Sequence, residues 1–293
     1  MSSSSHPGRL ISEVAASAPG TASLELSGGQ LRRRRLKVTR VPVTLPHLPP
    51  EMDGFRIVQI SDLHLEPFTK PRHIEETIAT CNALKPDLVA MTGDFVTNNT
   101  RHTGLLAELL SQLHAPCGVF ACLGNHDFWC GAPEVEKALS GRGIGVLRNE
   151  TRSIHTDGGR LQLAGIDSRY IGRPNLRAAL AGWKPEEPLV VMMHEPDVAD
   201  DLATAQIEAL QLSGHTHGGQ LRLGRLQPMA FRRARWGKKY LAGTYKVGSV
   251  QLYVNRGIGC VGVPLRVMCL PEVTEFTLRS PLSHPEFGRL ILS

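Results

Sequence analysis

The first half of the chain alternates short apolar runs with segments of helical spacing, and this alternation constrains the fold more than any other feature. Apolar runs occupy residues 55–62, 87–94 and 117–127, and helical spacing marks residues 71–85, 103–113 and 132–140. Strands that alternate with helices pair in parallel, because each helix returns the chain to the edge of the sheet where the next strand begins. We therefore predict an α/β fold in which helices cover a partly parallel sheet.

The second half of the chain is richer in strands. It carries apolar or alternating runs at residues 160–167, 188–195, 209–216, 219–223, 250–257 and 273–280, with helical segments near 174–181 and 197–204. A second sheet packed against the first would bury these strands. Residues 36–45 also alternate, and Pro42 predicts an edge position for this strand because proline has no amide hydrogen to donate to a neighbour.

Composition and the two ends of the chain indicate one folded domain. Hydrophobic residues make up 41% and charged residues 20% of the 293 residues, as in ordinary globular proteins. Residues 1–30 are rich in Ser, Ala and Gly, and we predict a disordered tail because such a segment can bury little apolar surface. We place the folded domain at residues 31–280 and predict a loose tail at residues 281–293.

Cysteine usage and hydropathy bear on the compartment. The six cysteines form no CxxC pair, and we interpret them as buried free thiols, which suits a reducing environment. No stretch approaches the roughly 18 apolar residues that a membrane span needs, and the N-terminus lacks the apolar core of a secretory signal. These features predict a cytoplasmic protein, with peripheral contact at a membrane surface left open.

Side chains that can bind metals follow five of the predicted strands. They are Asp62, His64, Asp94, Asn125, His126, Asp127, His194, His215 and His217. Ligands of α/β proteins bind beyond the carboxyl ends of strands, so five strand ends at one rim would bring these side chains into one pocket. Each motif alone also has an ordinary explanation: Asp94 suits a turn, and Asn125 and Asp127 suit a helix cap. Taken together and in order, the motifs predict a metal site.

The residue types indicate the chemistry. Carboxylate and amide oxygens suit hard divalent cations and imidazole suits transition metals, so the mixed set fits manganese, iron, zinc or cobalt. Two such ions about 3.5–4 Å apart need a bridging carboxylate, and they hold the attacking and leaving oxygens of a phosphoryl displacement. They also acidify a water into the nucleophile, so no serine or cysteine nucleophile is needed. We predict two divalent metal ions per chain and hydrolysis of a phosphate ester or anhydride.

Five motifs follow one another over about residues 55–220: D-x-H, G-D, G-N-H-D, H and G-H-T-H. In this order they resemble the motifs of the calcineurin-like metallophosphoesterase superfamily. The resemblance implies a four-layer α-β-β-α sandwich, with two mixed β-sheets face to face and helices outside. The G-D segment reads GDFVTNN and lacks the arginine of the Ser/Thr protein phosphatases, which argues against phosphoprotein substrates.

The same resemblance implies a role for each residue. The two metals would be held by Asp62, His64 and His217 and by Asn125, His194 and His215, respectively. Asp94 would bridge the two metals. His126 would contact the phosphate and protonate the leaving oxygen, and Asp127 would orient the imidazole of His126.

Three functions stay open at this stage. The lead-in LPPEMDGFRIVQISDLH and the later LYVNRGIG resemble a bacterial branch of small phosphodiesterases that includes UDP-2,3-diacylglucosamine pyrophosphatase. This resemblance favours a lipid-linked substrate such as UDP-diacylglucosamine. A soluble nucleotide or a cyclic phosphodiester is the alternative substrate. A binding protein with a degenerate site is a third function, which the complete set of motif residues argues against.

The segment FRRARWGKKY, at residues 231–240, combines basic and aromatic residues in a chain of formal net charge +6. It suits a flap that contacts an anionic lipid head group or a membrane surface, where Trp and Tyr are frequent. Nucleic-acid contact by stacking is less favoured, and a solvated loop is an equally good explanation. We therefore expect a phosphate-bearing small molecule or lipid head group as the partner, and the sequence implies no partner protein.

Overall fold

The computed structural model describes residues 36–221 and 239–283. The predicted tails at residues 1–30 and, for the most part, 281–293 lie outside the described residues, as does most of the basic and aromatic segment at 231–240. The end of the predicted strand at 219–223 also lies outside them. Within the described part, residues His217–Gly219 form a short 3-10 helix, η2, and Leu221 makes a single bridge to Val267.

The first sheet is mixed, and four of its strands are parallel to one another. Its six strands, in spatial order, are β1 (Lys37–Thr44), β12 (Glu272–Arg279), β2 (Arg56–Ile60), β3 (Leu88–Thr92), β4 (Val119–Cys122) and β5 (Gly145–Val146). Strands β2 to β5 are parallel, whereas β12 runs antiparallel to β2 and parallel to β1. The edge position of β1, which Pro42 predicted, is confirmed.

The second sheet is also mixed. Its strands, in spatial order, are β10 (Gly243–Val247), β11 (Val250–Val254), β9 (Ala209–Ser213), β8 (Leu189–Met193), β7 (Gly159–Ile166) and β6 (Glu150–Thr156). The four central strands are parallel, and the two edge strands pair antiparallel with their neighbours. The sequence did not predict β6 or β10, because an edge strand needs backbone hydrogen bonds from one neighbour rather than a strong apolar pattern.

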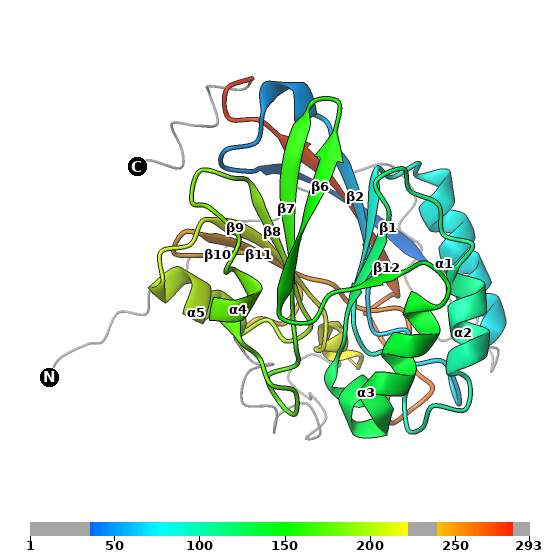
Figure 1. Cartoon of the computed structure of the whole chain (residues 1–293). Coiled ribbons are helices and arrows are strands. Elements are labelled where there is room, and N and C mark those ends of the chain that lie inside the picture. Colours follow the sequence, from blue (N-terminus) through cyan, green and yellow to red (C-terminus); the bar gives the residue numbers. More distant parts are fainter. Residues whose placement is uncertain (1–35, 222–238, 284–293) are drawn as a thin grey trace, which may run out of the picture.

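Helices lie on both outer faces, so the predicted four-layer sandwich is confirmed (Figure 1). The first sheet is covered by α1 (Pro71–Ala83), α2 (Thr103–Leu110) and α3 (Asn125–Ser140), and the second by α4 (Leu176–Ala179) and α5 (Val198–Thr204). A short 3-10 helix, η1 (Pro50–Met52), precedes β2. None of the helices in the described ranges is long and apolar enough to cross a membrane.

Three apolar layers separate the four layers of structure. Alternation along β2 shows how the sequence builds them: Ile57 points into the core between the two sheets, and Val58 and Ile60 point into the core beneath α1, α2 and α3. A third core lies between the second sheet and α4 and α5. Because both faces of the central strands are buried, these strands are largely apolar, and the site residues follow where they end.

Candidate metal centre

The site lies beyond the carboxyl ends of strands from both sheets. Residues Asp62 and His64 follow β2, Asp94 follows β3, and Asn125 begins α3 directly after β4. From the second sheet, His194 follows β8, and His215 and His217 follow β9. The structure brings all nine predicted residues into one network of contacts, as the positions of the strand ends predicted.

Five of the site residues have a left-handed backbone conformation. They are Asp62, His64, Asp94, His215 and His217, with φ between 45° and 72°. Residues other than glycine rarely adopt this conformation, at a cost of about 1–3 kcal/mol where the surroundings enforce it. Glycines permit the close approach of the loops: a Cβ added at Gly124 would lie 2.2 Å from Oδ1 of Asp94. The backbone is thus bent to aim these side chains inward.

One group of donor atoms comprises Asp62, His64 and His217. The Nε2 atom of His217 lies 3.3 Å from Oδ1 of Asp62 and 3.2 Å from Nε2 of His64. All three residues are buried, and their ligand atoms lie within 4.8 Å of one another. This is the set that the resemblance to the superfamily implied for the first metal.

A second group surrounds Asp94. The Nε2 atom of His194 lies 3.1 Å from Oδ2 of Asp94 and 4.0 Å from Oδ1 of Asp62. The same Asp94 oxygen lies 3.4 Å from Nε2 of His64, so Asp94 stands between the two groups. On the far side of this group, Nδ1 of His215 lies 2.9 Å from Oδ1 of Asn125.

Backbone carbonyl groups fix the orientation of three imidazoles. The Nδ1 atoms of His64, His126 and His194 lie 3.1, 2.7 and 2.6 Å from the carbonyl oxygens of Val96, Thr97 and Thr92, respectively. A carbonyl can only accept a hydrogen bond, so each Nδ1 carries a proton and each Nε2 is the nitrogen left to face the site. This is the tautomer that a metal ligand requires.

The donor set fits two divalent metal ions. The Nε2 atom of His194 is fully buried and has no hydrogen-bond partner, although it faces two carboxylates. Burying an unpartnered polar atom is costly, and a bound cation would remove that cost. Imidazole nitrogens together with carboxylate and amide oxygens are ligands of transition-metal ions.

Comparison with known proteins identifies the family. Residues 55–219 match the model of the calcineurin-like phosphoesterases. The chain belongs to this family. It is 35% identical to an uncharacterised metallophosphoesterase of Bacillus subtilis, YkuE, over 85% of this chain and 88% of the relative. It is 33% identical to the phosphodiesterase YaeI of Escherichia coli, over 76% of this chain and 82% of the relative.

Solved structures of related fold include a Thermus thermophilus protein, TT1561, with a TM-score of 0.48, 14% identity and coverage of 70% of this chain and 90% of that one. The calcineurin-like phosphoesterases depend on two metal ions, and this chain is a metal-dependent phosphoester hydrolase.

Charges inside the phosphoesterase site are strongly coupled. Burial alone would raise the pKa of Asp94, but His194 and His64 outweigh it and hold that pKa well below its ordinary value. Burial likewise disfavours the charged form of His194, yet the Asp94 carboxylate raises its pKa well above the usual range. Burial, together with the neighbouring His194, lowers the pKa of His215 to about 4. The site therefore holds an anionic carboxylate at Asp94 and a neutral imidazole at His215.

The prediction that Asp127 orients the imidazole of His126 is wrong. One carboxylate oxygen of Asp127 accepts hydrogen bonds from the amides of Asp94 and Gly124, both at 2.9 Å. The other accepts from the amides of Phe95 and Val96, at 2.8 and 3.2 Å. Because His126 already donates to Thr97, Asp127 instead ties the loop after β3 to the start of α3.

Sequence reasoning missed three residues that touch the predicted ligands. The ring of Trp129 lies 4.9 Å from that of His126, and the ring of Tyr170 lies 5.0 Å from that of His215. The guanidinium of Arg266 is buried, and its Nη2 atom lies 3.3 Å from Nδ1 of His217. The spacing of three residues between His126 and Trp129 would have revealed one contact, had the helix been predicted to begin at Asn125.

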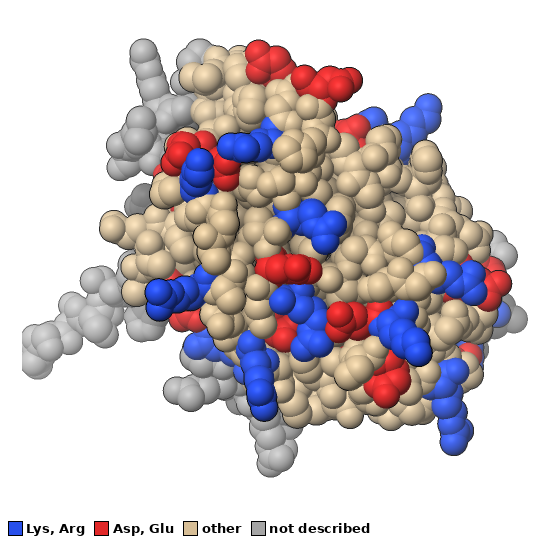
Figure 2. Space-filling view, in the orientation of Figure 1, with Lys and Arg blue, Asp and Glu red and all other residues tan. Residues whose placement is uncertain are grey.

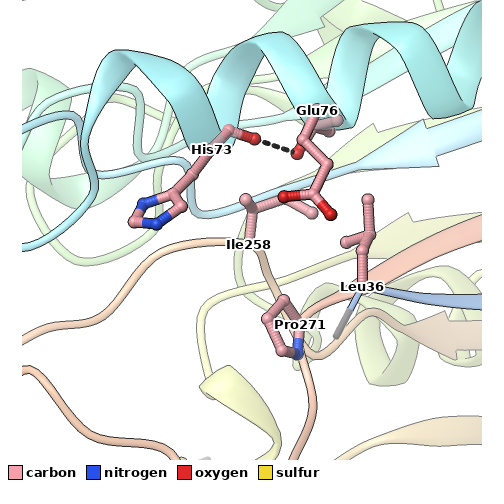
Figure 3. Close-up of a pocket in the computed structure, with 6 residues that line it drawn as sticks. Leu36, His73, Glu76, Ile258 and Pro271 are labelled. Atoms are coloured by element: carbon pink, nitrogen blue, oxygen red, sulfur yellow. Dashed lines mark hydrogen bonds between the residues drawn. The ribbon is translucent and has the colours of Figure 1, made fainter. Parts of the chain in front are cut away.

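A shallow pocket outside the metal centre lies between α1 and the loop that follows β11 (Figure 3). Its lining consists of Leu36, His73, Glu76, Thr77, Ile258 and Pro271. The amide of Ile258 donates to the carbonyl oxygen of Ser61, so this loop packs on the end of β2. None of the nine predicted site residues lines this pocket, and it offers no group of metal ligands.

Proposed function

We propose that this phosphoesterase hydrolyses a phosphodiester or pyrophosphate bond at a centre of two metal ions. The observation that carries the proposal is the convergence of buried carboxylate and imidazole atoms on Asp94, beside the unpartnered Nε2 of His194. The residues that would hold the ions are Asp62, His64 and His217 for one and Asn125, His194 and His215 for the other, with Asp94 between them. When bound, two such ions acidify a water and neutralise the charge of the phosphate.

The protein side chains have separate tasks. The amide of His126 donates to Oδ1 of Asp94, at 2.9 Å, which places the His126 imidazole at the edge of the metal ligands. Its Nε2 atom is free to contact the phosphate because Nδ1 is held by Thr97. Burial lowers the pKa of His126, and the Asp94 carboxylate opposes that effect. A phosphate bound beside His126 would raise this lowered pKa, so that the imidazole holds a proton for transfer to the leaving oxygen.

Exposed apolar side chains beside the site support a lipid-linked substrate such as UDP-diacylglucosamine. The Trp129 and Tyr170 side chains, in contact with His126 and His215, are 56% and 41% exposed. Exposed aromatic rings also suit stacking on a base, which favours a soluble nucleotide or cyclic phosphodiester as the second candidate. A long nucleic acid is less favoured, because described Lys and Arg side chains on the face in Figure 2 are interspersed with Asp and Glu.

The first experiment measures hydrolysis of bis-p-nitrophenyl phosphate with and without added Mn²⁺. We expect metal-dependent turnover and two metal ions per chain by elemental analysis. The Asp94→Ala variant should lose both, whereas the control Asp157→Ala, in an exposed turn, should keep both. Turnover that persists in Asp94→Ala would refute the proposed centre.

The second experiment separates the two candidate substrates. Hydrolysis of UDP-diacylglucosamine is compared with that of a 2′,3′-cyclic nucleotide, using the Mn²⁺-loaded enzyme. A higher kcat/KM for the lipid-linked pyrophosphate would support the leading proposal. Activity restricted to the soluble diester would replace it with the second candidate. Contact of residues 231–240 with a membrane belongs to the same proposal, and flotation with vesicles tests it.

A further inference from the structure

Large apolar side chains that are exposed gather around the metal centre. Six of the eight found among the described residues lie in three segments that contact His126, His215 or His217. We call these six the apolar rim: Trp129, Tyr170, Ile171, Val263, Leu265 and Met268. The other two are Leu105, on α2, and Leu282, after β12. An exposed apolar patch of this kind marks an interaction site when it is contiguous with a functional site.

The loop at residues 261–268 is the most prominent part of the rim. Val263 and Leu265 are 41% and 40% exposed, and Met268 is 76% exposed. Met268 also has a left-handed backbone, with φ of 51°. A bulky apolar residue held outward in this conformation gains nothing from the core of its own protein. This arrangement indicates a partner outside the folded chain.

Buried polar residues hold the loop in place. The side chain of Gln220 is fully buried, donates to the carbonyl oxygens of Val261 and Val263 and accepts from the amide of Val261, at 3.0–3.1 Å. Arg266 donates to the carbonyl oxygen of Gly259 at 2.8 Å and lies beside His217. Polar contacts, rather than apolar packing, therefore hold the loop against the residues of the metal centre.

Two backbone amides of the loop are hydrogen-bonded within the protein. The amide of Val263 donates to the carbonyl oxygen of Val261, at 2.8 Å, and the amide of Val267 donates to the carbonyl oxygen of Gln220, at 2.9 Å. Backbone groups that enter a bilayer must be satisfied within the protein, and these two amides are. Trp and Tyr side chains favour the boundary between lipid and water, which suits the other rim residues.

We propose that the apolar rim seats this protein on a lipid bilayer, so that the metal centre faces the phosphate head groups. The formal net charge of the whole chain, +6, complements the negative surface of a bilayer with anionic lipids, and the basic residues that supply this excess lie outside the described ranges. A bilayer fits three separate segments better than a protein partner does, because a fluid apolar phase needs no matching shape. The proposal depends on the proposed function only in its statement that the metal centre faces the head groups. Binding to the bilayer is measured separately from hydrolysis.

Flotation with vesicles of phosphatidylethanolamine and phosphatidylglycerol, three to one, tests the contact. The full chain is compared with Leu265→Gln combined with Met268→Asn, and asparagine tolerates the left-handed backbone at that position. Burial of the two exposed side chains accounts for a factor on the order of 20 or more in partitioning, so we expect the variant to lose at least that factor. The matched control, Leu105→Gln with Leu282→Gln, removes similar exposed apolar surface elsewhere and should bind like the wild type.

Two further arms keep the test decisive. Binding should survive 0.5 M NaCl, because salt screens charges but not apolar burial. Equal loss in the control pair, or binding lost only when Arg232, Arg233 and Arg235 are replaced by glutamine, would overturn the proposal. So would wild-type binding by the loop variant, or a self-associated species in light scattering that the loop variant abolishes without any vesicle binding. Hydrolysis of bis-p-nitrophenyl phosphate in the same samples reports on the proposed function separately.

Discussion

The carboxylate of Asp127 offers the sharpest test of how the site is held together. Replacing it with asparagine keeps the shape but turns one oxygen into an NH₂ group, which cannot accept hydrogen bonds. That group would face either the amides of Asp94 and Gly124 or those of Phe95 and Val96. Two buried amides would lose a charged acceptor, at about 1.5–3 kcal/mol each.

The Asp127→Asn variant should therefore lose about 3–6 kcal/mol of its free energy of unfolding. For a domain of this size, such a loss lowers Tm by roughly 6–20 °C. Asp94 and the start of α3 would also shift, so we expect metal affinity to fall by about 10- to 100-fold. Urea unfolding and metal titration measure both quantities, with Asp157→Asn as the exposed control. If Asp127→Asn keeps wild-type stability and metal affinity but shows a large fall in kcat, this reasoning is refuted. Asp127 would then have the role of orienting the imidazole of His126.

Three further predictions address other parts of the protein. His126→Ala should keep both metal ions but lower kcat by about 10²–10⁴-fold, as measured with bis-p-nitrophenyl phosphate, and loss of the metals would show that His126 is a ligand instead. Removing metal with a chelator should lower Tm, and restoring Mn²⁺ at about 100 times its Kd should return roughly 2.7 kcal/mol, a gain that Asp94→Ala should not show. Burial raises the pKa of Asp197 to about 6, despite Arg169 nearby, so the folded state binds this proton more tightly than the unfolded state. Asp197 should therefore disfavour the folded state less as pH falls from about 6 to 4, and Asp197→Asn should be more stable than the wild type by about 1–3 kcal/mol at pH 8 but not at pH 4.5, as measured by urea unfolding at both pH values.

Much of the fold could be predicted because buried strands carry their signal locally. The apolar runs that became β2, β3 and β8 are buried on both faces, and their composition alone reveals them. Strand β6 escaped prediction because most of its residues are polar and exposed, and its pairing with β7 supplies what its composition does not. Helix α3 consists of two helical segments on either side of Gly131, whose backbone is not helical. The predicted helix at residues 132–140 is the second segment, and the first escaped prediction because it begins with site residues rather than apolar ones.

In the candidate site, too, some features follow from local sequence and others only from the folded structure. The order of motifs and their position after strands predicted which residues meet around Asp94, because strand ends converge by geometry. The role of Asp127 could not be read from its place beside His126, because adjacent side chains on a helix point in different directions. Arg266 lies in a loop that no periodic pattern marks, and only the folded structure brings it to His217.

The split of the ligands between the two sheets has a consequence for biosynthesis. His64 and His217 meet at one group of donor atoms although they lie 153 positions apart in the chain. A growing chain cannot offer this group until β9 has been synthesised and both sheets have packed together, because a preformed metal site rarely exists before folding. The ions must therefore enter last, from whatever pool surrounds the finished fold. Since ligands of this kind discriminate weakly among transition metals, the metal found in the purified enzyme would record where the chain folded.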